Sequence, residues 1–313
     1  SIVLTIQRGV EKGGILSADE TWTPENEYLV TSNLLVDTGV SLTIEPGTRV
    51  EFDANTSIGV RGELFAFGTV PNRIEFSGCP RIQFYEDSPP TVFGGSGDYL
   101  SGSGFTYCVF EAGCGVRPLS IHGHYVGRSI FRSIRGYGQG AVFDFGGGVV
   151  ERSLAYETES SAFSCGNSCT FRYNTSVNNS FGIEAGAGGV IVGNSLFQNS
   201  PYSFQIQSDL DVFATDNYWG SVDPLTIDEM IYDFFDNPNL GVVYWNPPLP
   251  TPCTEAPPVL TGTTLNPPSP VGAERVTFTV TFSKPMNTAV RPEVFFGPAA
   301  PYTSHPVDVN PTW

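Results

Sequence analysis

The sequence contains very little lysine and methionine and no long hydrophobic run. Of its 313 residues, two are lysines (Lys12 and Lys284) and two are methionines, so good helix formers are scarce. No apolar stretch approaches the roughly 18 residues that a membrane-spanning helix requires. These absences argue against a helical bundle and against a transmembrane protein.

Basic residues are also few. The chain has 15 Lys and Arg against 32 Asp and Glu, a net charge of −17. A surface with this charge repels phosphate backbones and anionic lipid headgroups. We therefore expect neither nucleic acid nor a membrane surface as a partner.

Glycine, proline and aromatic residues are abundant instead, with 35 Gly, 25 Pro, 23 Phe and 13 Tyr. Gly and Pro favour tight turns, and aromatic side chains fit the pleated surface of a sheet. From residue 28 onward, runs of four to six residues alternate apolar and polar side chains between such turns. The composition and the pattern both predict an all-β protein.

The runs repeat at a measurable interval. Equivalent runs start 21, 24, 22, 20 and 23 residues apart, at Tyr107, Arg128, Arg152, Asn174, Asn194 and Asn217. A period near 22 with variable insertions is typical of the turns of a solenoid. It predicts a parallel β-helix over residues 20–245. In it, Asn174, Asn194 and Asn217 either form a hydrogen-bonded ladder or are separate turn residues.

The remaining segments are assigned around this solenoid. Residues 1–19 form an N-terminal strand or cap, residues 246–258 a stiff Pro-rich linker, and residues 259–313 a small β domain. An amphipathic helix over 223–236 would cover the last turn. Its predicted capping box is Thr226 with Glu229, and its apolar face consists of Ile227, Met230, Ile231, Phe234 and Phe235.

Six cysteines are present, without the paired C-x-x-C spacing of a zinc site. Two pairs lie close in sequence, Cys165 with Cys169 and Cys108 with Cys114, so local disulfides in an oxidising compartment are favoured over buried thiols.

Two parts of the sequence resemble known families. The segments Gly39-Val-Ser-Leu-Thr-Ile-Glu-Pro-Gly-Thr-Arg-Val-Glu-Phe52 and Asn217-Tyr-Trp-Gly220 resemble right-handed parallel β-helix repeat proteins of bacterial and archaeal surfaces, which share the pectate-lyase-like superfold. The likeness covers roughly residues 20–250. Val276 to Gly297 resembles a bacterial immunoglobulin-like domain, of which about half is present. The resemblance implies secretion and surface display, but no particular activity.

Candidate binding residues are few. Asp209, Asp211 and Asp216 are either calcium ligands, calcium being the one cofactor considered, or a solvated turn. His122 and His124 have a spacing that can hold zinc, or are an exposed pair without a third ligand. Glu157, Glu159 and Glu184 are candidates to line a carbohydrate groove. No catalytic residue is assigned, and the acceptor pattern for N-glycosylation occurs at Asn55, Asn174 and Asn178.

The sequence therefore favours a secreted structural or adhesive surface protein, such as a subunit of an S-layer, sheath or filament. The alternatives are a carbohydrate-binding or polysaccharide-degrading β-helix and a spacer in a long adhesin. Ile2, Leu4 and Ile6 belong to an apolar run outside the repeat. This run either adds to the 259–313 sheet of a neighbouring subunit or caps its own β-helix.

Overall fold

The computed structural model describes residues 9–111, 119–135, 140–144, 146–266, 268, 277–286, 294–296 and 303–305. The chain divides into two compact units, Ser1–Pro257 and Pro258–Trp313.

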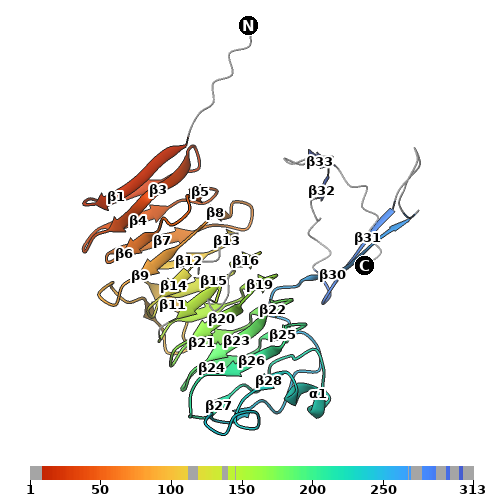
Figure 1. Cartoon of the computed structure of the whole chain (residues 1–313). Coiled ribbons are helices and arrows are strands. Elements are labelled where there is room, and N and C mark those ends of the chain that lie inside the picture. Colours follow the sequence, from red (N-terminus) through yellow and green to blue (C-terminus); the bar gives the residue numbers. More distant parts are fainter. Residues whose placement is uncertain are drawn as a thin grey trace. The chain divides into compact units, whose positions relative to one another are not determined.

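The first unit is a parallel β-solenoid of about eight turns, as the repeat predicts (Figure 1). Each turn contributes short strands to three faces. Face 1 is the eight-stranded sheet of β2 (Glu20–Trp22), β4 (Ser41–Ile44), β7 (Glu63–Phe67), β12 (Gly104–Thr106), β15 (Tyr125–Gly127), β18 (Val149–Glu151), β21 (Thr170–Arg172) and β24 (Val190–Val192).

The other two faces form one 17-stranded sheet because the long strands β1 (Val10–Leu16) and β3 (Glu27–Val36) contribute to both. Face 2 continues with β5 (Arg49–Phe52), β8 (Ile74–Gly78), β13 (Cys108–Glu111), β16 (Ile130–Arg132), β19 (Leu154–Tyr156), β22 (Thr175–Val177) and β25 (Ser195–Phe197). Face 3 continues with β6 (Ile58–Val60), β9 (Ile82–Phe84), β14 (Leu119–Ile121), β17 (Val142–Asp144), β20 (Ser161–Cys165), β23 (Phe181–Ala185), β26 (Tyr202–Ile206) and β28 (Ile231–Tyr232). Since β1 pairs in parallel with β3, the parallel sheet of the solenoid starts before residue 20, at Val10.

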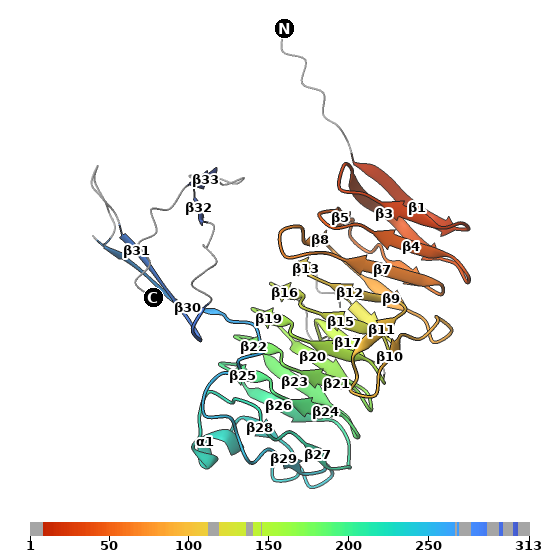
Figure 2. The same cartoon turned by 180° about the vertical axis from the view of Figure 1, so that it is seen from behind.

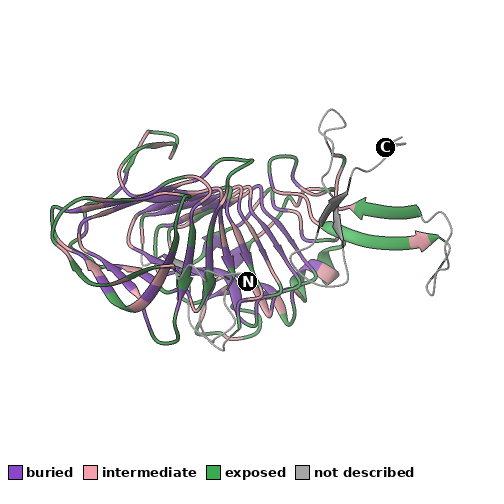
Figure 3. Cartoon of the chain, turned by 90° about the horizontal axis from the view of Figure 1, so that it is seen from above, coloured by how far each residue is buried: buried purple, intermediate pink, exposed green. Residues whose placement is uncertain are grey.

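Buried residues lie on the stacked strands of the solenoid (Figure 3), and their side chains form the core. On face 2, Phe76, Phe110 and Phe131 lie in register on successive turns. Their rings stack with centroids 4.7 and 4.8 Å apart, and all three are buried. This spacing is close to the 4.7–4.9 Å between neighbouring strands, so each ring contacts the next.

A column of buried polar side chains lies at the edge between faces 1 and 2. Its members are Cys108, Ser129, Ser153, Asn174, Asn194 and Asn217. From Ser129 on, each side-chain oxygen accepts a hydrogen bond from the backbone N–H of the previous member, at 3.2, 3.2, 2.9, 2.9 and 2.8 Å. The predicted asparagine ladder is confirmed and is continued by serines. A second ladder, Thr158 to Asn179 to Asn199, runs along the edge between faces 2 and 3.

The ladder corrects the predicted alignment by one residue. Arg152 is equivalent to Tyr173, not to Asn174, because Glu151 pairs with Arg172 immediately before them. Both residues have a positive φ, of 48° and 59°. This conformation turns one side chain outward and the next inward, so that Ser153 and Asn174 enter the ladder.

The predicted helix over 223–236 is wrong in extent and in capping. The helix α1 spans only Pro224–Asp228, and its N-cap is Asp223, whose carboxylate accepts from Thr226 N at 3.1 Å. Ile231 follows in β28, which pairs in parallel with β26 and extends the solenoid. Pairing with β26 gives the backbone of this segment hydrogen-bond partners outside a helix.

The exposed aromatic residues of this segment also depart from the prediction. Phe234 and Phe235 are 44% and 82% exposed, so they do not belong to an apolar face over the last turn. The chain then closes this end with β29 (Val243–Tyr244), which pairs with β27 (Val212–Phe213).

The Pro-rich segment is not a free linker. Residues 246–257, here called the strap, pack along the solenoid (Figure 2). Cys253 N donates to Ser195 Oγ at 3.0 Å, and the carbonyl of Pro257 accepts from Thr175 Oγ1 at 2.6 Å. Ala256 is 1% exposed. The boundary between the units therefore follows the strap.

The second unit is β structure in its described part. It contains two antiparallel pairs, β30 (Leu260–Asn266) with β31 (Thr277–Phe282), and β32 (Val294–Phe296) with β33 (Thr303–His305). Among the described residues of the whole chain, no helix has the length and apolar character needed to cross a membrane.

Candidate functional site

An arm of residues 85–103 leaves the solenoid between β9 and β12. It carries the antiparallel hairpin of β10 (Val92–Phe93) and β11 (Tyr99–Ser101). The arm explains why 34 residues separate Ile74 from its partner Cys108 on the next turn. In the sequence, an interval this much longer than the period near 22 indicates an inserted segment, which the predicted solenoid did not include.

The base of the arm is held by His124. The imidazole is buried and lies 3.2 Å from Ser88 Oγ through Nε2 and 3.1 Å from Thr91 Oγ1 through Nδ1. Burial and, to a smaller extent, the nearby His122 together lower the pKa of His124 to about 4. With both ring nitrogens engaged, His124 is not available as a zinc ligand, and because it is buried it is not part of an exposed pair either.

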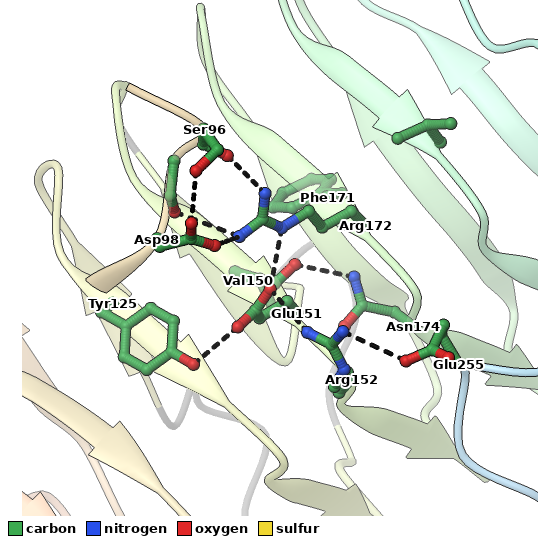
Figure 4. Close-up of polar contacts among 12 residues, drawn as sticks. Ser96, Asp98, Tyr125, Val150, Glu151, Arg152, Phe171, Arg172, Asn174 and Glu255 are labelled. Atoms are coloured by element: carbon green, nitrogen blue, oxygen red, sulfur yellow. Dashed lines mark hydrogen bonds and ion pairs between the residues drawn. The ribbon is translucent and has the colours of Figure 1, made fainter. Parts of the chain in front are cut away.

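The tip of the arm is held by Arg172 (Figure 4). Its guanidinium donates to the carbonyls of Ser96 and Gly97 at 2.6 and 3.2 Å and pairs with Asp98 at 3.2 Å. Its Nε donates to Glu151 at 2.7 Å. Burial disfavours the charged guanidinium, but the hydrogen bond to Glu151 and the nearby carboxylates raise the pKa of Arg172.

Glu151 joins the arm to the strap. This buried carboxylate also accepts from Tyr125 Oη at 2.8 Å and from Arg152 at 3.1 Å. Arg152 pairs in turn with Glu255 of the strap at 3.1 Å. The Glu151 carboxylate thus connects the arm with the strap, two segments that are distant in sequence. No pattern in the sequence predicts this connection.

A groove of about 590 Å³ lies beside the base of the arm, where Thr91 contacts His124. It is lined by Glu86, Pro90, Thr91 and Phe93 of the arm and by His122, Gly123, Gly146 and Gly147 of the solenoid turns. A volume of this size is in the range of small-molecule sites.

Asp144 holds the backbone of two lining residues, Gly123 and Gly146. Its buried carboxylate accepts from the backbone N–H groups of Gly123, Gly146 and Gly148 at 3.3, 3.0 and 2.6 Å. A side chain at Gly148 would meet this carboxylate, since its Cβ would lie 2.4 Å from Asp144 Oδ2. Burial raises the pKa of Asp144, although the three N–H groups oppose that rise.

The groove offers binding groups more than a catalytic set. Phe93 and Pro90 present apolar surfaces, while Glu86 and His122 present a carboxylate and an imidazole. Burial lowers the pKa of His122, and the charge of Glu86 partly offsets this. Glu86 is the only carboxylate among the described lining residues, whereas glycoside hydrolysis ordinarily uses two.

The three glutamates considered for a carbohydrate groove do not lie together. Glu157 and Glu159 line a second depression of about 410 Å³ together with Asn178 and Gln198. Glu184 is not part of it and is hydrogen-bonded to Ser161.

The predicted calcium ligands are not gathered into a site. Asp211 accepts from Val242 N at 2.8 Å, and Asp216 accepts from Thr215 Oγ1 at 3.2 Å, while Asp209 lies at a bend. Across the described ranges, no group of three His, Cys, Asp or Glu side chains could hold a metal ion.

Of the two local disulfides predicted from the sequence, one is present and the other is not. Cys165 and Cys169 form a disulfide. Cys108 does not pair locally as predicted: it is a buried free thiol that donates to the Ala66 carbonyl at 3.3 Å, and burial raises its pKa. Cys114 lies outside the described residues. Cys79, which had no assigned partner, is disulfide-bonded.

Of the glycosylation candidates, Asn55 and Asn178 are exposed turn residues. The prediction of a glycosylation site at Asn174 is wrong, because this side chain is fully buried in the ladder and cannot accept a glycan. Ile2, Leu4 and Ile6 lie outside the described residues. Comparison of the chain with protein-family models, with curated proteins and with solved structures gave no match.

Proposed function

We propose that the chain is a structural or adhesive protein of the extracellular surface, built as a right-handed β-helix and used in an S-layer, sheath or filament. The polar ladder is the observation that carries this proposal. It links six successive turns through buried backbone-to-side-chain hydrogen bonds. Buried, fully paired polar networks make a structure rigid, which suits a protein that bears load.

The disulfides support an extracellular location. Both sulfurs of Cys165–Cys169 are buried, and Cys79 is oxidised as well. Disulfides of this kind persist outside the reducing cytosol.

The second unit supports self-association. The β30–β31 pair leaves Leu260, Phe278 and Val280 between 44% and 66% exposed. We infer a partial immunoglobulin-like domain that accepts a further strand, supplied by Ile2, Leu4 and Ile6 of the next subunit. Such a head-to-tail contact does not close on itself and generates a fibre.

The test of this proposal is the assembly state of the purified full chain. Electron microscopy and sedimentation should show fibres that disappear in the triple variant Ile2→Asp, Leu4→Asp, Ile6→Asp. The matched control Thr5→Asp with Gln7→Asp charges the opposite side of the same strand and should still assemble. A chain that stays monomeric at high concentration, or fibres that survive the triple variant, would contradict the strand-addition contact.

Carbohydrate binding is the second candidate, and the arm groove favours it. Phe93 and Pro90 supply surfaces for the apolar face of a sugar ring, and Glu86 and His122 supply hydrogen-bonding groups. On a glycan array, Phe93→Ala should weaken a bound glycan about tenfold, while Val92→Ala, a neighbour outside the groove lining, should not. Release of reducing ends from that glycan would show degradation instead of binding.

A further inference from the structure

An outer column of side chains runs beside the polar ladder, one residue per turn. Tyr107, Arg128, Arg152, Tyr173, Gly193 and Asp216 each directly precede a ladder residue, and Arg73 precedes Ile74, which pairs with the ladder residue Cys108. Successive backbones are hydrogen-bonded, for example Tyr107 N to Gly127 O at 3.2 Å and Arg128 N to Glu151 O at 3.0 Å. The column therefore forms one continuous edge of the solenoid.

The strap covers the lower part of this edge. Cys253 packs where the column has no side chain, with its sulfur 3.6 Å from the position of a Cβ on Gly193. Glu255 of the strap then pairs with Arg152, whose guanidinium lies 5.0 Å from the Tyr173 ring. A carboxylate of the proline-rich strap, at a turn in which Ala256 N donates to Cys253 O at 3.3 Å, is thus already bound to one arginine of the edge, Arg152.

The upper part of the edge presents two arginines without a carboxylate. The guanidinium carbons of Arg73 and Arg128 lie 5.6 and 5.8 Å from the centroid of the Tyr107 ring. Within the described part of the chain, neither makes an ion pair, whereas six other basic side chains do: Lys12, Arg49, Arg61, Arg132, Arg152 and Arg172.

Unpaired arginines side by side are unexpected in a chain of net charge −17. Arg128 is exposed, but Arg73 is half-buried, and its one described hydrogen bond is to the Arg128 carbonyl at 3.2 Å. Burial lowers the pKa of Arg73, because its charge is removed from water without a neutralising partner. A bound carboxylate would offset that cost. It would also accept hydrogen bonds from guanidinium N–H groups that donate to no described residue.

We propose that Arg73, Tyr107 and Arg128 form a docking site for an extended acidic peptide segment of a partner protein, which continues along the edge where the strap leaves it. Glu255 on Arg152 is the internal precedent for the contact. Arg73 and Arg128 are two turns apart, about 9.6 Å at the usual strand spacing. A polyproline II chain advances about 9.3 Å in three residues, so acidic side chains at every third position match the two arginines. This site is separate from the arm groove and from the strand-addition contact.

The probe is a fluorescein-labelled (Glu-Pro-Pro)₄ peptide, with (Gln-Pro-Pro)₄ as its uncharged match. Fluorescence anisotropy with the full chain should show binding of the Glu peptide at low salt, and at least fivefold weaker binding of the Gln peptide. Arg128→Gln and Arg73→Gln should each weaken binding at least fivefold. Arg81→Gln, the same charge change at an exposed arginine elsewhere, should leave it unchanged.

Thermal melts of each variant separate lost binding from lost folding, and the exposed Arg128 gives the test independently of the half-buried Arg73. Three results would overturn the proposal: no binding of the Glu peptide, equal loss in Arg81→Gln, or tighter Arg128-dependent binding of polygalacturonate than of the peptide. The last would assign the site to an acidic polysaccharide. None of these readouts depends on fibre formation or on the arm groove.

Discussion

The backbone N–H of Asn174 donates to the side-chain Oδ1 of Asn194, one turn further along the solenoid, at 2.9 Å. The Nδ2 of Asn174 reaches the same oxygen at 3.1 Å, and Asn194 repeats the arrangement toward Asn217. A single buried amide therefore serves two turns.

Removing one amide from this ladder should be costly. In Asn194→Ala, the Asn174 backbone N–H and the Phe171 carbonyl both lose a buried partner. We expect a loss of about 3 kcal/mol in the free energy of unfolding, measured by urea denaturation. Asn26→Ala, at an exposed turn, should change it by less than about 0.5 kcal/mol. Equal effects in the two variants would show that the ladder does not stabilise the fold.

How much of this could be read from the sequence depends on whether a pattern is periodic. Asn174, Asn194 and Asn217 recur with the turn, so the ladder was predictable. Its serine continuation was missed, because the outward residue Arg152 was aligned with the inward Asn174. The offset arises from the positive-φ backbone before each ladder residue, which leaves no mark on hydrophobic periodicity.

Non-periodic features could not be predicted in the same way. The arm, the Glu151 network and the course of the strap depend on contacts between residues up to 103 positions apart. Proline-rich composition predicts stiffness, but it carries no information on whether the stiff segment packs. The strap packs because Cys253 and Ala256 bury their side chains on the solenoid.

The end of the solenoid provides a matched pair of substitutions. Ile231 is 4% exposed and lies in register with Phe204, whereas Phe234 is 44% exposed. Ile231→Asp buries an unpaired charge and should cost about 4 kcal/mol or more. Phe234→Asp should cost less than about 1 kcal/mol. Equal losses in the free energy of unfolding, measured by urea denaturation, would instead support the long amphipathic helix that the sequence pattern predicts.

Alkylation should distinguish the cysteines by their environment. In the native, unreduced protein, Cys108 should resist iodoacetamide, because it is fully buried and burial raises the pKa of its thiol. Unfolding in urea without a reductant should expose Cys108 to labelling, while Cys165 and Cys169 remain unlabelled until reduction. Mass spectrometry that finds Cys165 or Cys169 alkylated before reduction would contradict their disulfide.

The buried His124 should make the fold sensitive to acid. Its pKa is about 4 in the folded chain and about 6.5 when unfolded, so the unfolded state binds the proton more tightly. The neutral imidazole is thus fully compatible with folding above pH 6.5, and stability should fall as the pH drops from 6.5 toward 4. The total loss from this group is about 3 kcal/mol.

His124→Gln isolates that contribution. Glutamine keeps a donor and an acceptor for Ser88 and Thr91 but does not titrate in this range. Urea denaturation at pH 7 and pH 4.5 should show a smaller acid-induced loss in the variant than in the parent chain. Asp144 works in the opposite direction, because its raised pKa favours the folded state at low pH, but it is common to both proteins and cancels in the difference. The same pH dependence in both proteins would mean that His124 is not the group that limits stability in acid.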